Sequence, residues 1–224
     1  MSEIRERLER LKETIRTCES RYGRKPGSVA LVAVSKRQPI EAVREAFAAG
    51  QRAFGENYLK EAKTKIDTLA ESTAVWHFIG TIQSNKTAEI AALFDWVHTV
   101  DREKLARRLS EQRPAGRPPL NVCLQVNTSG EKTKSGIAPS ALPALIEAVV
   151  ELPRLKLRGL MALPAPETVF ERQRLAFEQL ARLAAESTAS FDTLSIGTSG
   201  DFEAAIAEGS TMVRIGTAVF GPRA

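Results

Sequence analysis

From about residue 29 onward, short apolar runs alternate with longer amphipathic stretches. Eight apolar runs have the length of buried strands, at 29–34, 53–55, 76–80, 96–100, 120–126, 155–163, 193–197 and 212–216. Stretches with apolar residues at helical spacing separate them, at about 38–49, 57–70, 84–93, 101–112, 138–151, 167–186 and 201–208. Another amphipathic helix is predicted over about 2–22, before the first strand.

This alternation of strand and helix predicts a parallel sheet with helices on its outside. Eight strands favour a closed (β/α)8 TIM-type barrel over an open sheet. The 224 residues fit one such barrel, which needs roughly 200–250 residues, so we expect a single α/β domain over residues 1–224. Because the second and third predicted strands are short, an open doubly wound sheet is the alternative.

Charge and cysteine content narrow the class of protein. The 32 basic and 27 acidic residues give a net charge of +5, and both signs interleave along the predicted helices. We interpret this as a solvated surface and expect no nucleic-acid partner. Cys18 and Cys123 are far apart and match neither a disulfide framework nor a metal site. The N-terminus is charged, and no run approaches the ~20 apolar residues of a membrane span, so we expect a cytoplasmic protein without a membrane partner.

Polar residues gather where the predicted strands end, which is where barrel enzymes place their chemistry. Lys36 directly follows the first strand, and partial burial at a barrel mouth would free its amine as a nucleophile. A surface lysine that ends the strand is the alternative. The other polar residues at strand ends include Ser35, Glu56, Asn57, Gln83, Lys86, His98, Asp101, Asn127, Thr198, Ser199, Asp201 and Thr217.

Arg214 lies inside the last predicted strand. Alternation puts Val213 and Ile215 on the face toward the helices and Arg214 on the face toward the barrel interior. A buried guanidinium stays charged and needs partners. A ligand could supply them, or an ion pair with an acid such as Glu56.

The loops after the seventh and eighth strands form the usual phosphate site of such barrels. Here they read GTSGD at 197–201 and IGT at 215–217. Small residues let backbone N–H groups approach an anion, and a helix beginning after Ser199 would favour its charge. Two kinds of site combine a rim lysine, an inward arginine and a loop that can bind phosphate. One holds pyridoxal 5′-phosphate (PLP) on Lys36, and the other is a lysine-imine aldolase acting on a sugar phosphate.

Several motifs in one order resemble the pyridoxal-phosphate homeostasis protein family (YggS/PROSC type) over nearly the whole chain. They are LVAVSK at 31–36, FGENY at 54–58, WHFIG at 76–80 with QSNK at 83–86, KSG at 134–136, RGLMA at 158–162 and GSTMVRIGT at 209–217. The resemblance implies a barrel like the N-terminal domain of alanine racemase, without that enzyme's second, β-rich domain.

The same resemblance implies roles for individual residues. Lys36 would carry PLP as an imine (Schiff base), and Arg214 would face the pyridine nitrogen. Phosphate would be bound by Ser199, Gly216 and Thr217, while Asn57 and Met161 would belong to the pocket wall. Gln38 stands where many members carry a second lysine, which puts cofactor exchange through that lysine in doubt. Thr198 stands where a methionine commonly precedes the serine.

The implied role is cofactor supply and balance in vitamin B6 and amino-acid metabolism, with PLP-dependent apoenzymes as candidate recipients. An arginine beside the pyridine nitrogen leaves it unprotonated and stabilises carbanions poorly. This favours a carrier or buffer without robust catalysis, and a weak amino-acid racemase is the alternative. We interpret His77 and His98 as packed or hydrogen-bonded residues and expect no metal site.

Overall fold

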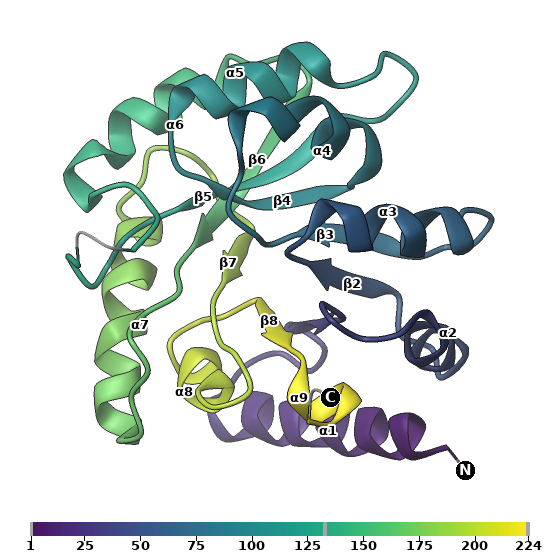
Figure 1. Cartoon of the computed structure of the whole chain (residues 1–224). Coiled ribbons are helices and arrows are strands. Elements are labelled where there is room, and N and C mark those ends of the chain that lie inside the picture. The colour runs from purple at the N-terminus through teal and green to yellow at the C-terminus, as the bar shows by residue number, and fades with distance from the viewer. Residues whose placement is uncertain (1, 132–133, 223–224) are drawn as a thin grey trace.

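Eight parallel strands close into one barrel in the computed structural model, which describes residues 2–131 and 134–222 (Figure 1). The strands follow chain order around the barrel, and β1 pairs with β8, with Val32 opposite Arg214. This pairing excludes the open sheet and confirms the predicted (β/α)8 barrel.

Each predicted strand has a counterpart with nearly the same limits. The strands are β1 Ala30–Val34, β2 Ala53–Glu56, β3 Val75–Phe78, β4 Trp96–Val100, β5 Leu120–Gln125, β6 Leu155–Met161, β7 Thr193–Ser195 and β8 Met212–Ile215. The sixth is shorter than predicted because its apolar sequence continues into the loop that contains Leu163 and Pro164. Hydrophobicity alone does not mark that end of the strand.

Helices surround the barrel, as Figure 1 shows. They are α1 Glu3–Arg21, α2 Ile40–Ala48, α3 Leu59–Thr68, α4 Thr87–Leu93, α5 Glu103–Gln112, α6 Leu142–Val150, α7 Phe170–Ala185, α8 Phe202–Ala207 and α9 Thr217–Phe220, with 3-10 turns at Ser84–Lys86 and Pro139–Ala141. The short helix α9 was not predicted. Within the described ranges, no helix combines the length and apolar character needed to span a membrane.

The N-terminal helix α1 completes the outer ring. It packs against α2, α8 and α9 and buries Leu8, Leu11 and Ile15 (Figure 1). The helix that follows β8 has only four residues, so it is too short to cover the seam between β8 and β1. The buried face of α1 covers this region instead.

Strand alternation divides the core into two layers. Phe54, Val213 and Ile215 belong to the apolar cluster between the barrel and its helices. The other face of the strands points into the barrel, where the buried residues include His98 and Arg214. The barrel interior therefore contains polar groups beneath the rim where the strands end.

Candidate functional site

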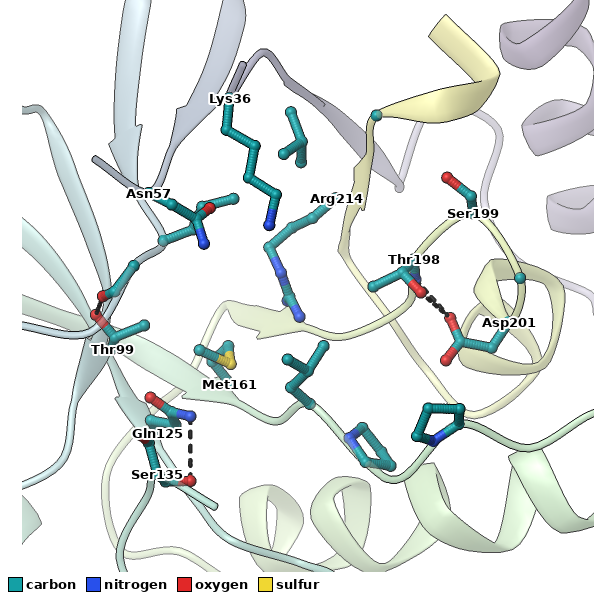
Figure 2. Close-up of a pocket in the computed structure, with 18 of the residues that line it drawn as sticks. Lys36, Asn57, Thr99, Gln125, Ser135, Met161, Thr198, Ser199, Asp201 and Arg214 are labelled. Atoms are coloured by element: carbon teal, nitrogen blue, oxygen red, sulfur yellow. Dashed lines mark hydrogen bonds between the residues drawn. The ribbon is translucent and has the colours of Figure 1, made fainter. Parts of the chain in front are cut away.

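A cavity of about 580 Å³ opens at the rim formed by the carboxyl ends of the strands (Figure 2). Parallel strands end on the same rim, so residues far apart in the sequence meet there. All seven site residues expected from the sequence line this cavity: Lys36, Asn57, Met161, Ser199, Arg214, Gly216 and Thr217. The lining also contains residues that were not predicted to belong to the site, including Thr99, Gln125, Lys134, Ser135, Leu163 and Glu167.

The backbone on both sides of Lys36 is held in place. Ser35 N donates to Gly55 O at 3.0 Å, and the N–H of Arg37 donates to Glu61 Oε2 at 2.8 Å. Arg37 has a φ of 59°, a left-handed conformation that is unusual for a residue with a side chain. These contacts fix the turn that follows β1, and Figure 2 shows the Lys36 side chain pointing from it into the cavity, toward Arg214.

Glu56 lies behind this turn and is absent from the cavity lining. Its Oε1 accepts a hydrogen bond from Ser35 Oγ at 2.6 Å and forms an ion pair with Lys65 Nζ at 2.7 Å. Burial raises the pKa of the Glu56 carboxyl, and Lys65 and Ser35 oppose that rise. The suggested ion pair between Glu56 and Arg214 is therefore wrong, because Glu56 faces α3.

Arg214 points into the barrel, as the alternation in β8 predicted, and only 6% of it is exposed. Its Nη1 donates to Ser195 O at 2.6 Å and to Ser195 Oγ at 2.7 Å, while Nη2 donates to Ala162 O at 3.1 Å. Burial lowers the pKa of Arg214 to about 10, so the guanidinium is still charged at neutral pH. These partners are all neutral, which leaves a positive charge at the cavity floor suited to a hydrogen-bond acceptor or an anion.

His77 and His98 are hydrogen-bonded inside the barrel. His77 Nδ1 lies 2.9 Å from His98 Nε2, and His98 Nδ1 lies 2.8 Å from Ser195 Oγ. Burial lowers the pKa of His77 to about 3 and that of His98 well below its usual value. The interpretation of both as hydrogen-bonded residues is confirmed, but His98 lies beneath the rim, not on it.

The two loops expected to bind phosphate border the same cavity. Gly197 has a φ of 96° and turns the chain out of β7 into a loop in which Thr198 N donates to Asp201 Oδ1 at 2.6 Å. Helix α8 begins at Phe202, close to the predicted start at about residue 201. Helix α9 begins at Thr217, and Val219 N and Phe220 N in its single turn both donate to Gly216 O at 2.9 Å. Ser199 and Thr217 are exposed on this side of the cavity.

Other polar residues at the strand ends lie outside this cavity. Gln83 and Lys86 line a second cavity of about 920 Å³ beside α3 and α4. Asn127 Nδ2 donates to Glu131 O at 2.9 Å and helps to hold its own loop. The Asn57 side chain, in contrast, has a buried Oδ1 without a hydrogen-bond partner in the described part of the chain. Across residues 2–131 and 134–222, no group of three or more metal-binding side chains is assembled.

Known proteins resemble this chain along nearly its whole length. Residues 7–224 match the family described as alanine racemase, N-terminal domain. The pyridoxal phosphate homeostasis protein of Pseudomonas aeruginosa is 59% identical, over 100% of this chain and 97% of that protein. The protein of the same name from Escherichia coli K12 is 51% identical, over 100% and 98%.

A solved structure is also similar to this chain over nearly its whole length. PipY of Synechococcus elongatus PCC7942, determined with PLP bound, is 37% identical to this chain, with a TM-score of 0.85. The match covers 98% of this chain and 100% of PipY. The two proteins therefore share one fold over nearly their whole length. The chain therefore belongs to the family of pyridoxal phosphate homeostasis proteins, within the wider alanine racemase N-terminal domain family.

Proposed function

We propose that this protein binds PLP in the cavity at the barrel rim, carries it on Lys36, and acts as a cytoplasmic carrier or buffer for vitamin B6 and amino-acid homeostasis. The names of the relatives and the PLP bound to PipY support the identity of the ligand. One observation carries the proposal: the Lys36 amine, the buried Arg214 guanidinium and the Thr217 hydroxyl border one cavity.

Lys36 provides the covalent attachment. Bound PLP supplies an aldehyde, with which a lysine amine forms an imine and releases water. The fixed turn around Lys36 directs its side chain to one part of the cavity, which reduces the entropy lost when the amine meets the aldehyde. Lys134 lines the same cavity, but it belongs to a loop after β5 and its Nζ forms an ion pair with Glu131 at 3.1 Å.

Arg214 orients the ring and limits its chemistry. A guanidinium donates hydrogen bonds and does not give up its proton, so a pyridine nitrogen that accepts from Arg214 stays unprotonated. An unprotonated ring withdraws electrons weakly, which is unfavourable for reactions that pass through a carbanion. The residue at this position therefore supports holding PLP more than transforming amino acids with it.

The opposite end of the cavity suits a phosphate. Ser199 and Thr217 offer hydroxyl donors, and Gly216 has no side chain to block the approach of an anion to the backbone that follows β8. A Cβ at residue 216 would also lie 3.1 Å from Val34 O, beside the start of the Lys36 turn. The remaining wall includes Met161 and Asn57, whose buried Oδ1 could accept a hydrogen bond from the ligand.

The test uses the purified wild-type protein mixed with PLP. We expect a visible absorbance band that borohydride removes, and one phosphopyridoxyl group mapped by mass spectrometry to the peptide that contains Lys36. Lys36→Ala should lose both signals, while Lys134→Ala should keep them. A wild-type label on Lys134, or a reducible adduct that persists there in Lys36→Ala, would contradict the assignment.

The carrier role needs a separate measurement, because tight binding alone does not establish delivery. Loaded protein should restore activity to a PLP-dependent apoenzyme when a phosphatase removes free PLP. If the phosphatase prevents the apoenzyme from regaining activity, the protein releases PLP into solution without delivering it, and its role is limited to buffering.

A further inference from the structure

A line of four hydrogen-bonded side chains runs from the cavity floor into the barrel interior. Arg214 Nη1 lies 2.7 Å from Ser195 Oγ, which lies 2.8 Å from His98 Nδ1, and His98 Nε2 lies 2.9 Å from His77 Nδ1. All four residues are at most 6% exposed. Only Arg214 lines the cavity, so a ligand there would contact the line at this end alone.

The guanidinium sets the direction of each hydrogen bond. Arginine has donors and no acceptor, so Ser195 Oγ must accept from Arg214. The single hydroxyl proton of Ser195 is then donated to His98 Nδ1, which is the other group within reach of that oxygen among the described residues. His98 consequently carries its proton on Nε2 and donates it to His77 Nδ1, which leaves the proton of His77 on its own Nε2.

The opposite direction is less favourable. A proton on His98 Nδ1 would make Ser195 Oγ accept twice, and its hydroxyl proton would be buried without an acceptor. An unsatisfied buried donor costs roughly 1–3 kcal/mol. Both rings are also neutral, since burial lowers the pKa of each histidine. The line therefore has one polarity, with Ser195 presenting an acceptor to the arginine.

We infer that Ser195, supported by His98 and His77, is a positioning residue that holds the Arg214 guanidinium in one orientation for its ligand. This inference rests on the proposed function, because the contact it serves is that of Arg214 with the PLP ring nitrogen. The three hydrogen bonds to Ser195 and Ala162 account for three of the five guanidinium N–H groups. Within the described part of the chain, the N–H of Nε and one N–H of Nη2 are left as the donors through which Arg214 would meet the ring.

The polarity can be tested in the wild-type protein without any ligand. The chain has two histidines, and both belong to this line, so imidazole ¹⁵N spectra report on it alone. Both rings should have a protonated Nε2 and an unprotonated Nδ1, and neither should titrate over about pH 5.5–8, where a free histidine does. A proton on His98 Nδ1, or titration of either ring, would overturn the inference even if PLP binds as proposed.

The positioning role is tested with two ligands, PLP and its analogue with carbon in place of the ring nitrogen. Ser195→Ala should weaken PLP binding roughly threefold to tenfold, less than the loss of a whole hydrogen bond to a charged group because Arg214 itself remains, and it should weaken analogue binding less. The matched control is Thr193→Val, which removes another buried hydroxyl of β7 whose Oγ1 donates to Asp192 Oδ1 at 2.8 Å. This control should leave the ratio of the two affinities unchanged.

Circular dichroism and thermal unfolding establish which variants fold. His98→Gln alters the group behind Ser195 and keeps the hydroxyl, so it provides the same comparison if Ser195→Ala does not fold. Reduced discrimination between PLP and the analogue supports positioning. Equal losses for both ligands in the variant that folds would reduce Ser195 to a structural role. Failure of the wild type to bind either ligand would instead overturn the proposed function.

Discussion

Nζ of Lys65 lies 2.7 Å from Oε1 of Glu56, and this buried ion pair supports the backbone that leads into Lys36. The same Nζ donates to Ser35 O at 2.7 Å, and Ser35 Oγ donates to Glu56 at 2.6 Å. Helix α3 is thereby joined to the ends of β1 and β2. The turn that contains Lys36 thus depends on a cation that lies outside the cavity lining.

Lys65→Met should destabilise the protein strongly, because it leaves the Glu56 carboxylate buried without its counter-ion. The free energy of unfolding, measured in urea at pH 7.5, should fall by roughly 3–5 kcal/mol, which is the usual cost of removing one partner of a buried ion pair. The loss should be smaller at about pH 5, because burial raises the pKa of Glu56 and protonation removes the unpaired charge. The control is Lys63→Met on the exposed side of α3, which should cost less than about 0.5 kcal/mol. Equal costs for the two variants would contradict the role of Lys65.

The sequence contained a signal for this pair, although it was not recognised. Gly55 faces the barrel interior, where a Cβ would lie 3.0 Å from Val32, so alternation directs the next residue, Glu56, toward the helices. Lys65 lies three positions after Ala62 on the buried face of α3. Strand and helix periodicity together thus place an acid opposite a lysine, whereas grouping residues by strand end placed Glu56 at the rim.

Ser199→Ala and Thr217→Ala should weaken the binding of PLP more than that of pyridoxal, because each removes a hydroxyl donor from the end of the cavity that we propose holds the phosphate. One hydrogen bond to a charged group is worth ~1.5–3 kcal/mol, which corresponds to roughly a tenfold to hundredfold change in affinity. Titration of both ligands measures the difference. Ser140→Ala, an exposed serine outside the cavity lining, is the control. The same loss for PLP and pyridoxal would mean that these loops do not contact phosphate.

Local patterns within one strand predicted part of this site, whereas contacts between residues far apart in the sequence could not be predicted. Val213 and Ile215 flank Arg214 with apolar residues, so local alternation was enough to point the arginine inward. The partners of Arg214 could not be predicted in this way. Ser195 and Ala162 meet it through strand pairing around the barrel, and the contact between His77 and His98 depends on the register of β3 and β4. Helix α9 was missed because four residues give no measurable periodicity.

The buried histidines should make stability fall as the pH drops below about 6.5. In the folded state their pKa values are lowered, to about 3 for His77, whereas in the unfolded chain they are near 6.5. Between these values the unfolded chain binds protons that the folded protein does not, so stability is present above pH 6.5 and is lost as the pH falls. At pH 5.5 His77 should cost about 1.4 kcal/mol relative to pH 7.5, and His98 acts in the same direction.

Urea unfolding at pH 7.5 and 5.5 measures this loss, and the interval stays above the range in which most carboxylates titrate. A folded His77→Gln variant should lose less stability between the two pH values than the wild type, because one of the two groups no longer titrates. An identical pH dependence in both proteins would show that His77 does not contribute through its lowered pKa.

The wild type should show no substantial turnover of free amino acids, and Arg214→Glu alone should not create an efficient racemase. A glutamate at this position could protonate the pyridine nitrogen and ease loss of the α-proton. It would also remove the guanidinium from Ser195 and Ala162, and it would place a carboxylate where the cavity floor now carries a positive charge. Weaker PLP binding is therefore expected together with any gain in proton exchange.

Inversion also requires a second base on the far side of the substrate carbon, and such acid–base help is typically worth 10²–10⁴-fold. Lys36 can act from one side only. Exchange of the α-hydrogen and change of chirality should therefore be followed separately, with alanine and serine, in both proteins. Slow exchange with little inversion fits a carrier. Inversion by the wild type at the ~1–10³ s⁻¹ typical of enzymes would make it a true racemase, since that rate cannot arise from a single base beside a weak electron sink.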